Sequence, residues 1–205
     1  MLFVWYKVSF DEKWSHGSAV CETVYFFVEF VCVFPWKCVS LNNQNRGKIM
    51  DGILRKLPIG IQTFEKLREG DYLYVDKTAL VWRIASTETP YFLSRPRRFG
   101  KSLLLSTFEA YFEGKKELFE GLAIADMEKE WKTYPVFHLD LNAEKYDSPQ
   151  ALVEILSRQL TQWELKYGKG EDEETLSGRF AGVIRRACEQ SGRGVVVLVD
   201  EYDKP

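Results

Sequence analysis

The segment FLSRPRRFGKSLLLSTF, residues 92–108, contains the motif on which the predicted fold depends. Gly100, Lys101 and Ser102 match the end of the phosphate-binding pattern G-x-x-x-x-G-K-[ST], which follows a strand and opens a helix. Arg95 stands where the first glycine of that pattern belongs, and this departure weakens the motif because that position often has a backbone angle that other residues resist. The dense cluster of basic side chains consists of Arg95, Arg97, Arg98 and Lys101.

The matched half of the pattern contains the chemistry that a phosphate needs. Gly100 lets backbone N–H groups approach closely, Lys101 supplies an ammonium for the terminal phosphates, and Ser102 supplies a hydroxyl for Mg²⁺. A bare G-K-[ST] occurs by chance in roughly one in ten chains of this length, so the context has to decide. The alternatives for the arginines are a charged turn and a nucleic-acid patch. The candidate nucleotide-binding residues are Arg97, Arg98, Phe99, Gly100, Lys101, Ser102 and Leu103.

A second signature lies at the other end of the chain, in VVVLVDE at residues 195–201. A run of five apolar residues without polar alternation is typical of a strand buried on both faces of a parallel sheet. Asp200 would then lie at the carboxyl end of its strand, where ligands bind in open α/β sheets, and could hold Mg²⁺ together with Ser102. Glu201 is placed to orient or deprotonate an attacking water. Lys101 and Glu201 are the catalytic candidates; a solvated loop is the alternative for the two acids.

The elements between these signatures alternate between strand and helix, which predicts a three-layer α/β fold with a parallel central sheet. Turn and capping residues set the expected boundaries; for example, Ser148 can cap a helix that Gly168 ends. The expected helices cover residues 63–68, 78–85, 101–113, 149–167 and 173–190. The expected strands cover residues 72–75, 91–93, 136–142 and 195–199.

The overall composition favours no polyanionic partner. The chain has 205 residues and a formal net charge of −2, so attraction to nucleic acid would have to come from local clusters. Four cysteines without a C-x-x-C pair argue against a zinc site or a disulfide framework and favour the cytoplasm. The most apolar run, residues 24–34, is shorter than the ~20 residues that a membrane-spanning helix needs, and we predict no membrane association.

Residues 1–49 differ in composition from the rest and end in a polar linker at residues 40–48. One interpretation is a small β-like appendage or edge hairpin. The other, which we favour, is that Met50 is the natural start and that the preceding residues are upstream sequence included by a misplaced start. Mass spectrometry of the native amino terminus distinguishes them, because peptides from residues 1–49 would exclude the second.

Four segments closely resemble the bacterial AAA-ATPase-like family: residues 57–81, 91–122, 134–142 and 195–205. The phosphate loop of that family also reads R-P-R-R-F-G-K-S, so Arg95 looks like a family feature. The resemblance implies a P-loop NTPase-like fold that binds ATP and Mg²⁺, with Gly100, Lys101 and Ser102 in its Walker A motif. Asp200 and Glu201 would form its Walker B motif. Many members also have a PD-(D/E)XK nuclease-like domain at the carboxyl end, which implies nucleic acid as a further partner.

The resemblance also implies that residues 50–205 are a P-loop domain truncated after the Walker B motif. ATPases of this class continue with further strands, one of which lies between the phosphate-loop strand and the acidic-motif strand. We therefore expect a gap at the centre of this sheet and a fragment that hydrolyses ATP poorly. The function predicted for the complete protein is ATP binding and hydrolysis. The alternatives are a nucleotide-gated switch and a nucleic-acid-binding module.

Three further residues or elements are less specific. The YVDKT element, residues 74–78, is typical of the family, and its Asp76 or Thr78 could cap a helix or contact the nucleotide. His138 fits a hydrogen-bonded structural histidine better than a catalytic one. Asp140 on the same strand could end near the site, but an anchoring role in the following loop fits better.

Overall fold

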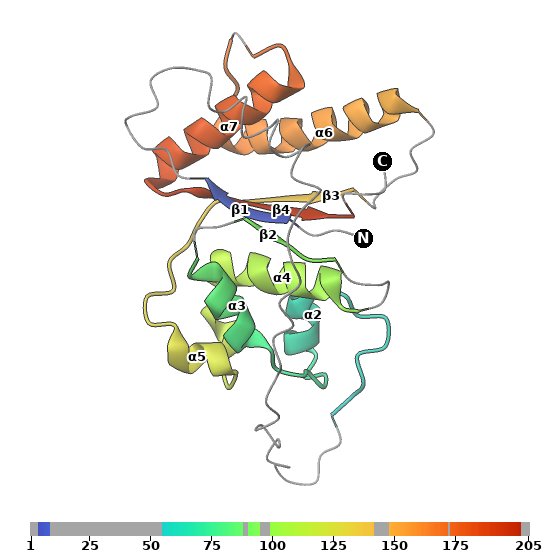
Figure 1. The fold of residues 1–205 in the computed structure, drawn as a ribbon, viewed down its shortest axis with the longest axis vertical. Helices are drawn as coiled ribbons and strands as arrows, with labels where there is room; N and C mark the ends of the chain where they lie inside the picture. Colours follow the sequence, from blue (N-terminus) through green and yellow to red (C-terminus); the bar gives the residue numbers. More distant parts are fainter. Residues whose placement is uncertain are drawn as a thin grey trace.

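A computed structural model describes residues 55–87, 90–94, 99–141, 148–171 and 173–201, and the backbone of residues 4–8. The described part is a three-layer arrangement with a sheet between two groups of helices (Figure 1). The strands are β1 (Val4–Val8), β2 (Tyr91–Phe92), β3 (Val136–Asp140) and β4 (Val195–Asp200).

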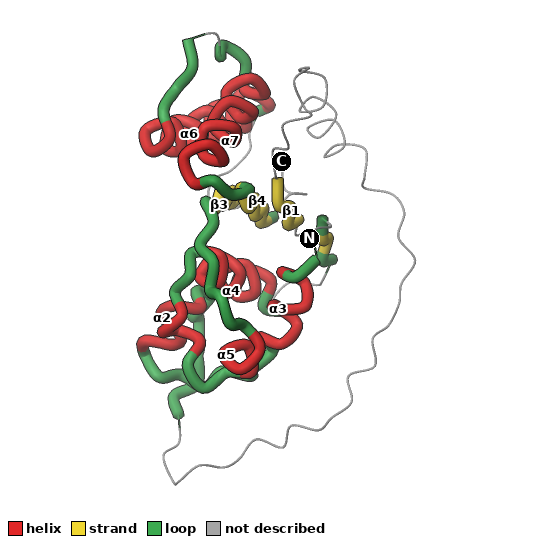
Figure 2. Tube along the Cα trace, turned by 90° about the vertical axis from the view of Figure 1, so that its left-hand side faces the viewer, coloured by secondary structure: helices red, strands yellow, loops and turns green. Residues whose placement is uncertain are grey.

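Figure 2 shows the two helical layers separated by the sheet. One layer contains α2 (Phe64–Glu69), α3 (Thr78–Ala85), α4 (Lys101–Phe112), the 3₁₀ turn Lys116–Phe119 and α5 (Ala123–Met127). The other contains α6 (Pro149–Tyr167) and α7 (Leu176–Ser191). The mixture of helices and strands agrees with the predicted α/β class. Among the described residues, none of these helices is long and apolar enough to cross a membrane.

The strand order is β2-β1-β4-β3, and one strand is reversed. β3 and β4 pair in parallel, whereas β1 is antiparallel to both β2 and β4. β2, β3 and β4 therefore run in the same direction. The prediction of a parallel central sheet is correct for these three strands and wrong for β1. The expectation of a gap at the centre of the sheet is also wrong for the described sheet. β1 lies between β2 and β4 and pairs with both of them. β1 is thus an interior strand of the described sheet.

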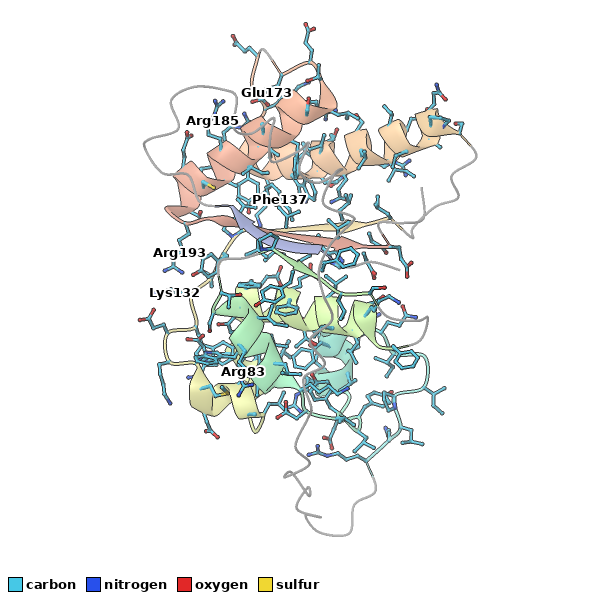
Figure 3. All side chains as sticks on the ribbon, viewed as in Figure 1. Arg83, Lys132, Phe137, Glu173, Arg185 and Arg193 are labelled. Atoms are coloured by element: carbon cyan, nitrogen blue, oxygen red, sulfur yellow. The ribbon has the colours of Figure 1, made fainter. Side chains whose placement is uncertain are left out.

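β4 separates two hydrophobic cores. Val196 and Leu198 face a core that contains Leu105 and Phe108 of α4, whereas the alternate residues of β4 face α6 and α7. All six residues of β4 are buried, which confirms the prediction of a strand covered on both faces. Phe137 of β3 points toward the α6–α7 layer, where its ring stacks on Trp163 with 4.5 Å between centroids (Figure 3).

Local capping residues determine the ends of α6 and α7. Ser148 accepts a hydrogen bond from the backbone N–H of Ala151, and α6 ends at Gly168, as predicted. α7 begins at Leu176 and not near residue 173, because Thr175 caps it. Glu173 instead lies beside the middle of α7, close to Gly182, and forms an ion pair with Arg186.

The predicted strand at residues 72–75 is wrong. Only Tyr72 takes part in β pairing, through an isolated bridge to Lys56. Tyr74 instead packs edge-on against Phe64 of α2, with 5.3 Å between ring centroids, and joins the core under α4. Packing of the aromatic ring therefore decides the conformation here, because β propensity is weak without a neighbouring strand.

The YVDKT element joins the starts of two helices. One carboxylate oxygen of Asp76 accepts hydrogen bonds from the N–H and hydroxyl of Thr78, at 2.8 and 2.6 Å. Its other oxygen accepts from the N–H of Ala123 at 2.7 Å, and the Thr78 hydroxyl accepts from the N–H of Ile124. The N-cap position of α3 is Lys77 and not Asp76 or Thr78 as expected, but the side chains of Asp76 and Thr78 do accept hydrogen bonds from N–H groups at the starts of α3 and α5.

We expect Asp76→Ala to lower the free energy of unfolding by about 1–3 kcal/mol, because the N–H groups of Thr78 and Ala123 lose a charged acceptor. The measurement is urea denaturation followed by circular dichroism. Glu69→Ala, at an exposed site at the end of α2, is the matched control and should change stability by no more than about 0.5 kcal/mol. Equal stabilities of the two variants would contradict the capping role.

Candidate functional site

Gly100 forms the corner where the basic loop becomes α4. Its φ of 73° and ψ of 27° lie in the left-handed region, where a side chain is unfavourable, so glycine is required by the turn and not by close packing. As the N-cap, Gly100 cannot provide a side chain to the N–H groups of the first helical turn. These groups and the positive end of the α4 dipole form a site that favours an anion.

Lys101 and Ser102 follow Gly100 and form the start of α4. Lys101 is only 5% exposed although it carries an ammonium group. The hydroxyl of Ser102 donates a hydrogen bond of 2.6 Å to the Oδ2 atom of Asp200. This contact connects residues that are 98 positions apart in the chain, and it ties the first turn of α4 to the carboxyl end of β4.

The two acids after β4 are both buried. Asp200 is 5% exposed, and its Oδ1 atom accepts a 3.0 Å hydrogen bond from the N–H of Glu201. Glu201 is 9% exposed and has a φ of 57°, an unfavourable angle for a residue with a side chain. Such backbone strain is concentrated at functional sites, where the surrounding structure maintains it.

The structure thus brings four of the predicted site residues to one edge of the sheet: Lys101, Ser102, Asp200 and Glu201. The other predicted residues of the loop are more peripheral. Phe99 is 65% exposed, whereas Leu103 is partly buried and packs against the core around α4. Arg97 and Arg98, like Arg95, lie outside the described residues.

A second ionisable pair connects α4 to β3. His138 Nδ1 lies 3.0 Å from the Oε2 atom of Glu109. The expectation of a hydrogen-bonded structural histidine holds for Nδ1 only, since Nε2 is buried without a partner among the described residues. Glu109 was not predicted; the signal in the sequence is its position seven residues, about two helical turns, after Ser102.

The surrounding charges favour protonated His138. Burial opposes the charge on the imidazole, but the hydrogen bond to Glu109 and the negative charges of Glu109, Asp140 and Asp200 outweigh it and raise the pKa of His138 above its usual value. Because the folded pKa is the higher one, the stabilisation is complete below the unfolded pKa of about 6.5 and is lost as the pH rises through the folded value.

We therefore expect the free energy of unfolding of the wild type to fall relative to that of Glu109→Gln as the pH rises above about 6.5. The difference should be on the order of 1 kcal/mol, since both side chains are partly exposed. Urea denaturation between pH 5.5 and 8.5 measures it. His16→Gln removes the only other histidine and should retain the wild-type pH dependence; a Glu109→Gln profile parallel to the wild type would contradict the expectation.

The donor atoms at the corner fit a metal that arrives with phosphates. Within the described ranges, no group of three or more His, Cys, Asp or Glu side chains could hold a metal ion. Mg²⁺, however, is commonly bound by one or two carboxylates together with substrate phosphates and water. The Ser102 hydroxyl and the Asp200 carboxylate, 2.6 Å apart, are a donor set of this kind.

Together, these features define an α/β domain in which a glycine-lysine-serine corner opens a helix beside a strand that ends in two acids. Residues 58–205 match the AAA-ATPase_like family, described as "Predicted AAA-ATPase". The chain belongs to this AAA-ATPase-like family, as its resemblance predicted.

The name of a curated relative does not state an activity. It is the "Uncharacterized protein in vnfD 5'region" of Azotobacter chroococcum mcd 1, which is 45% identical over 152 residues. The match covers 74% of this chain but 30% of the relative, so the chain spans less than a third of that protein's length. No solved structure matches.

Proposed function

We propose that this chain is an ATP-binding domain of the P-loop NTPase type. In this proposal, the N–H groups in the first turn of α4 would hold the terminal phosphates of ATP, and Ser102 and Asp200 would hold Mg²⁺. The observation that carries the proposal is the 2.6 Å hydrogen bond between Ser102 and Asp200, because it joins the two halves of the predicted motif. Family membership supports a nucleotide as the ligand.

Each residue of the site has a distinct role in this proposal. The N–H groups that follow Gly100 bind phosphate oxygens, and Lys101 neutralises part of their charge. Ser102 and Asp200 hold Mg²⁺, which when bound withdraws charge from the phosphate oxygens. The preference for ATP over other nucleotides comes from the family alone.

In the complete protein, we propose that the site hydrolyses ATP with Glu201 acting on the attacking water. Glu201 follows Asp200 directly at the carboxyl end of β4, and its carboxylate is the type of group that accepts a proton in such reactions. Its strained backbone angle supports a functional constraint at this position.

Isothermal titration calorimetry of the purified chain with ATP tests the binding step. We expect saturable binding in the presence of Mg²⁺, weaker binding in EDTA, and competition by ADP. The absence of binding under both conditions would contradict the proposed function. A salt-dependent affinity for DNA that ATP does not displace would instead support a nucleic-acid-binding module.

A further inference from the structure

The pairing of β3 with β4 places a second carboxylate beside the candidate metal site. Asp140 is the direct partner of Asp200 in the parallel register, two positions beyond the pair His138 and Leu198. Neighbouring strands are about 4.8 Å apart, and directly paired residues point to the same face of a sheet. Asp140 is therefore on the face of Asp200 and at the same edge.

That face is the one that α4 covers. Leu198 packs into the core around α4, His138 contacts Glu109 of α4, and Asp200 contacts Ser102 at the start of α4. His138 and Asp140 are alternate residues of β3 on this face. His138 lies beside the second half of α4 at Glu109, and Asp140 lies nearer the start of α4, opposite Asp200 and its contact with Ser102.

The two aspartates differ in their surroundings. Asp200 is buried, and its two oxygens accept hydrogen bonds from Ser102 and from the N–H of Glu201. Asp140 is exposed to solvent at the end of β3. Since Mg²⁺ releases its water reluctantly and usually keeps several water ligands, an exposed carboxylate beside it is suited to accept hydrogen bonds from those waters.

We propose that Asp140 is a positioning residue that would bind water ligands of a Mg²⁺ ion held at Asp200. This inference rests on the proposed function, because it needs Ser102 and Asp200 to hold Mg²⁺. It assigns to Asp140 a role different from the loop anchor that the sequence favours. Outer carboxylates of this kind orient metal ligands, and their loss typically lowers metal affinity by about 10- to 100-fold.

The test measures ADP binding by calorimetry as a function of free Mg²⁺, with Asp140→Asn as the variant. Mg²⁺ is expected to strengthen ADP binding, and the free Mg²⁺ concentration that gives half of this increase should be about tenfold or more higher for Asp140→Asn than for the wild type. The affinity for ADP in EDTA should be the same for both proteins. Asp140→Glu should restore part of the Mg²⁺ response. Glu154→Gln, an exposed acid on α6 across the sheet, is the matched control and should leave both affinities unchanged.

The outcomes separate this inference from the proposed function. If the wild type binds ADP in a Mg²⁺-dependent way and Asp140→Asn behaves identically, the inference is overturned and the proposed function stands. An equal loss of ADP affinity with and without Mg²⁺ would identify a purely structural role for Asp140 and would also overturn it. No ADP binding by the wild type would overturn both.

Discussion

Replacing Lys101 by alanine is expected to weaken ATP binding by about 1.5–3 kcal/mol, which is roughly a 10- to 150-fold loss of affinity. Lys101 is 5% exposed and lies in the first turn of α4, one residue before the hydroxyl that contacts Asp200. A charge-assisted contact with phosphate in such a place is stronger than one in open solvent, because water competes less. Calorimetric titration with ATP and Mg²⁺ measures the loss.

The control for this variant is Lys116→Ala, which removes an exposed ammonium group beyond the opposite end of α4. It should leave ATP affinity unchanged. Because Lys101 is buried, thermal unfolding of each variant has to be recorded alongside, so that loss of folding is not mistaken for loss of binding. A folded Lys101→Ala variant with the affinity of the wild type would remove the support for this residue as a phosphate ligand.

In the complete protein, replacing Glu201 by glutamine is expected to lower the rate of ATP hydrolysis by about 10²- to 10⁴-fold while ATP affinity stays within a few-fold of the wild type. Glutamine keeps the shape of the side chain but cannot accept a proton from water. Release of phosphate under saturating ATP measures the rate, and calorimetry measures the affinity.

Glu174→Gln, at an exposed position before α7, is the matched control for Glu201→Gln and should hydrolyse ATP at the wild-type rate. Retained biological activity in Glu201→Gln, with nucleotide binding intact, would favour the nucleotide-gated switch over the enzyme. A wild-type rate of hydrolysis in Glu201→Gln would contradict the role of Glu201.

The sequence predicts best those elements whose signals are local. The ends of α4 and α6 follow from Gly100, Ser148 and Gly168, because capping and left-handed turns involve residues only a few positions apart. α7 begins at Leu176, three residues later than expected, because its cap is Thr175 and the acids before it lie outside the helix.

The non-local features of the sheet could not be predicted in the same way. The position of β1 between β2 and β4 brings together residues from opposite ends of the chain, and nothing in its own sequence indicates its partners or its direction. The strand predicted at residues 72–75 failed for the related reason that a strand needs a neighbour to pair with.

The candidate site also contains residues predicted from local motifs and residues that only the tertiary structure brings together. Gly100, Lys101, Ser102 and Asp200 follow from motifs in which spacing and residue type carry the chemistry. The pairing of Asp140 with Asp200 requires the register of β3 against β4, and the contact of His138 with Glu109 requires the packing of α4 on the sheet. Both contacts depend on tertiary structure, so local sequence patterns do not predict them.

A crystal structure of the chain with Mg²⁺ and a non-hydrolysable ATP analogue tests whether the corner at Gly100 and the end of β4 form one nucleotide site. We expect Mg²⁺ at about 2.0–2.1 Å from the Ser102 hydroxyl oxygen, close to Asp200, with phosphate oxygens on the N–H groups at the start of α4. An analogue bound elsewhere on the molecule, or Mg²⁺ coordinated without either Ser102 or Asp200 nearby, would contradict it.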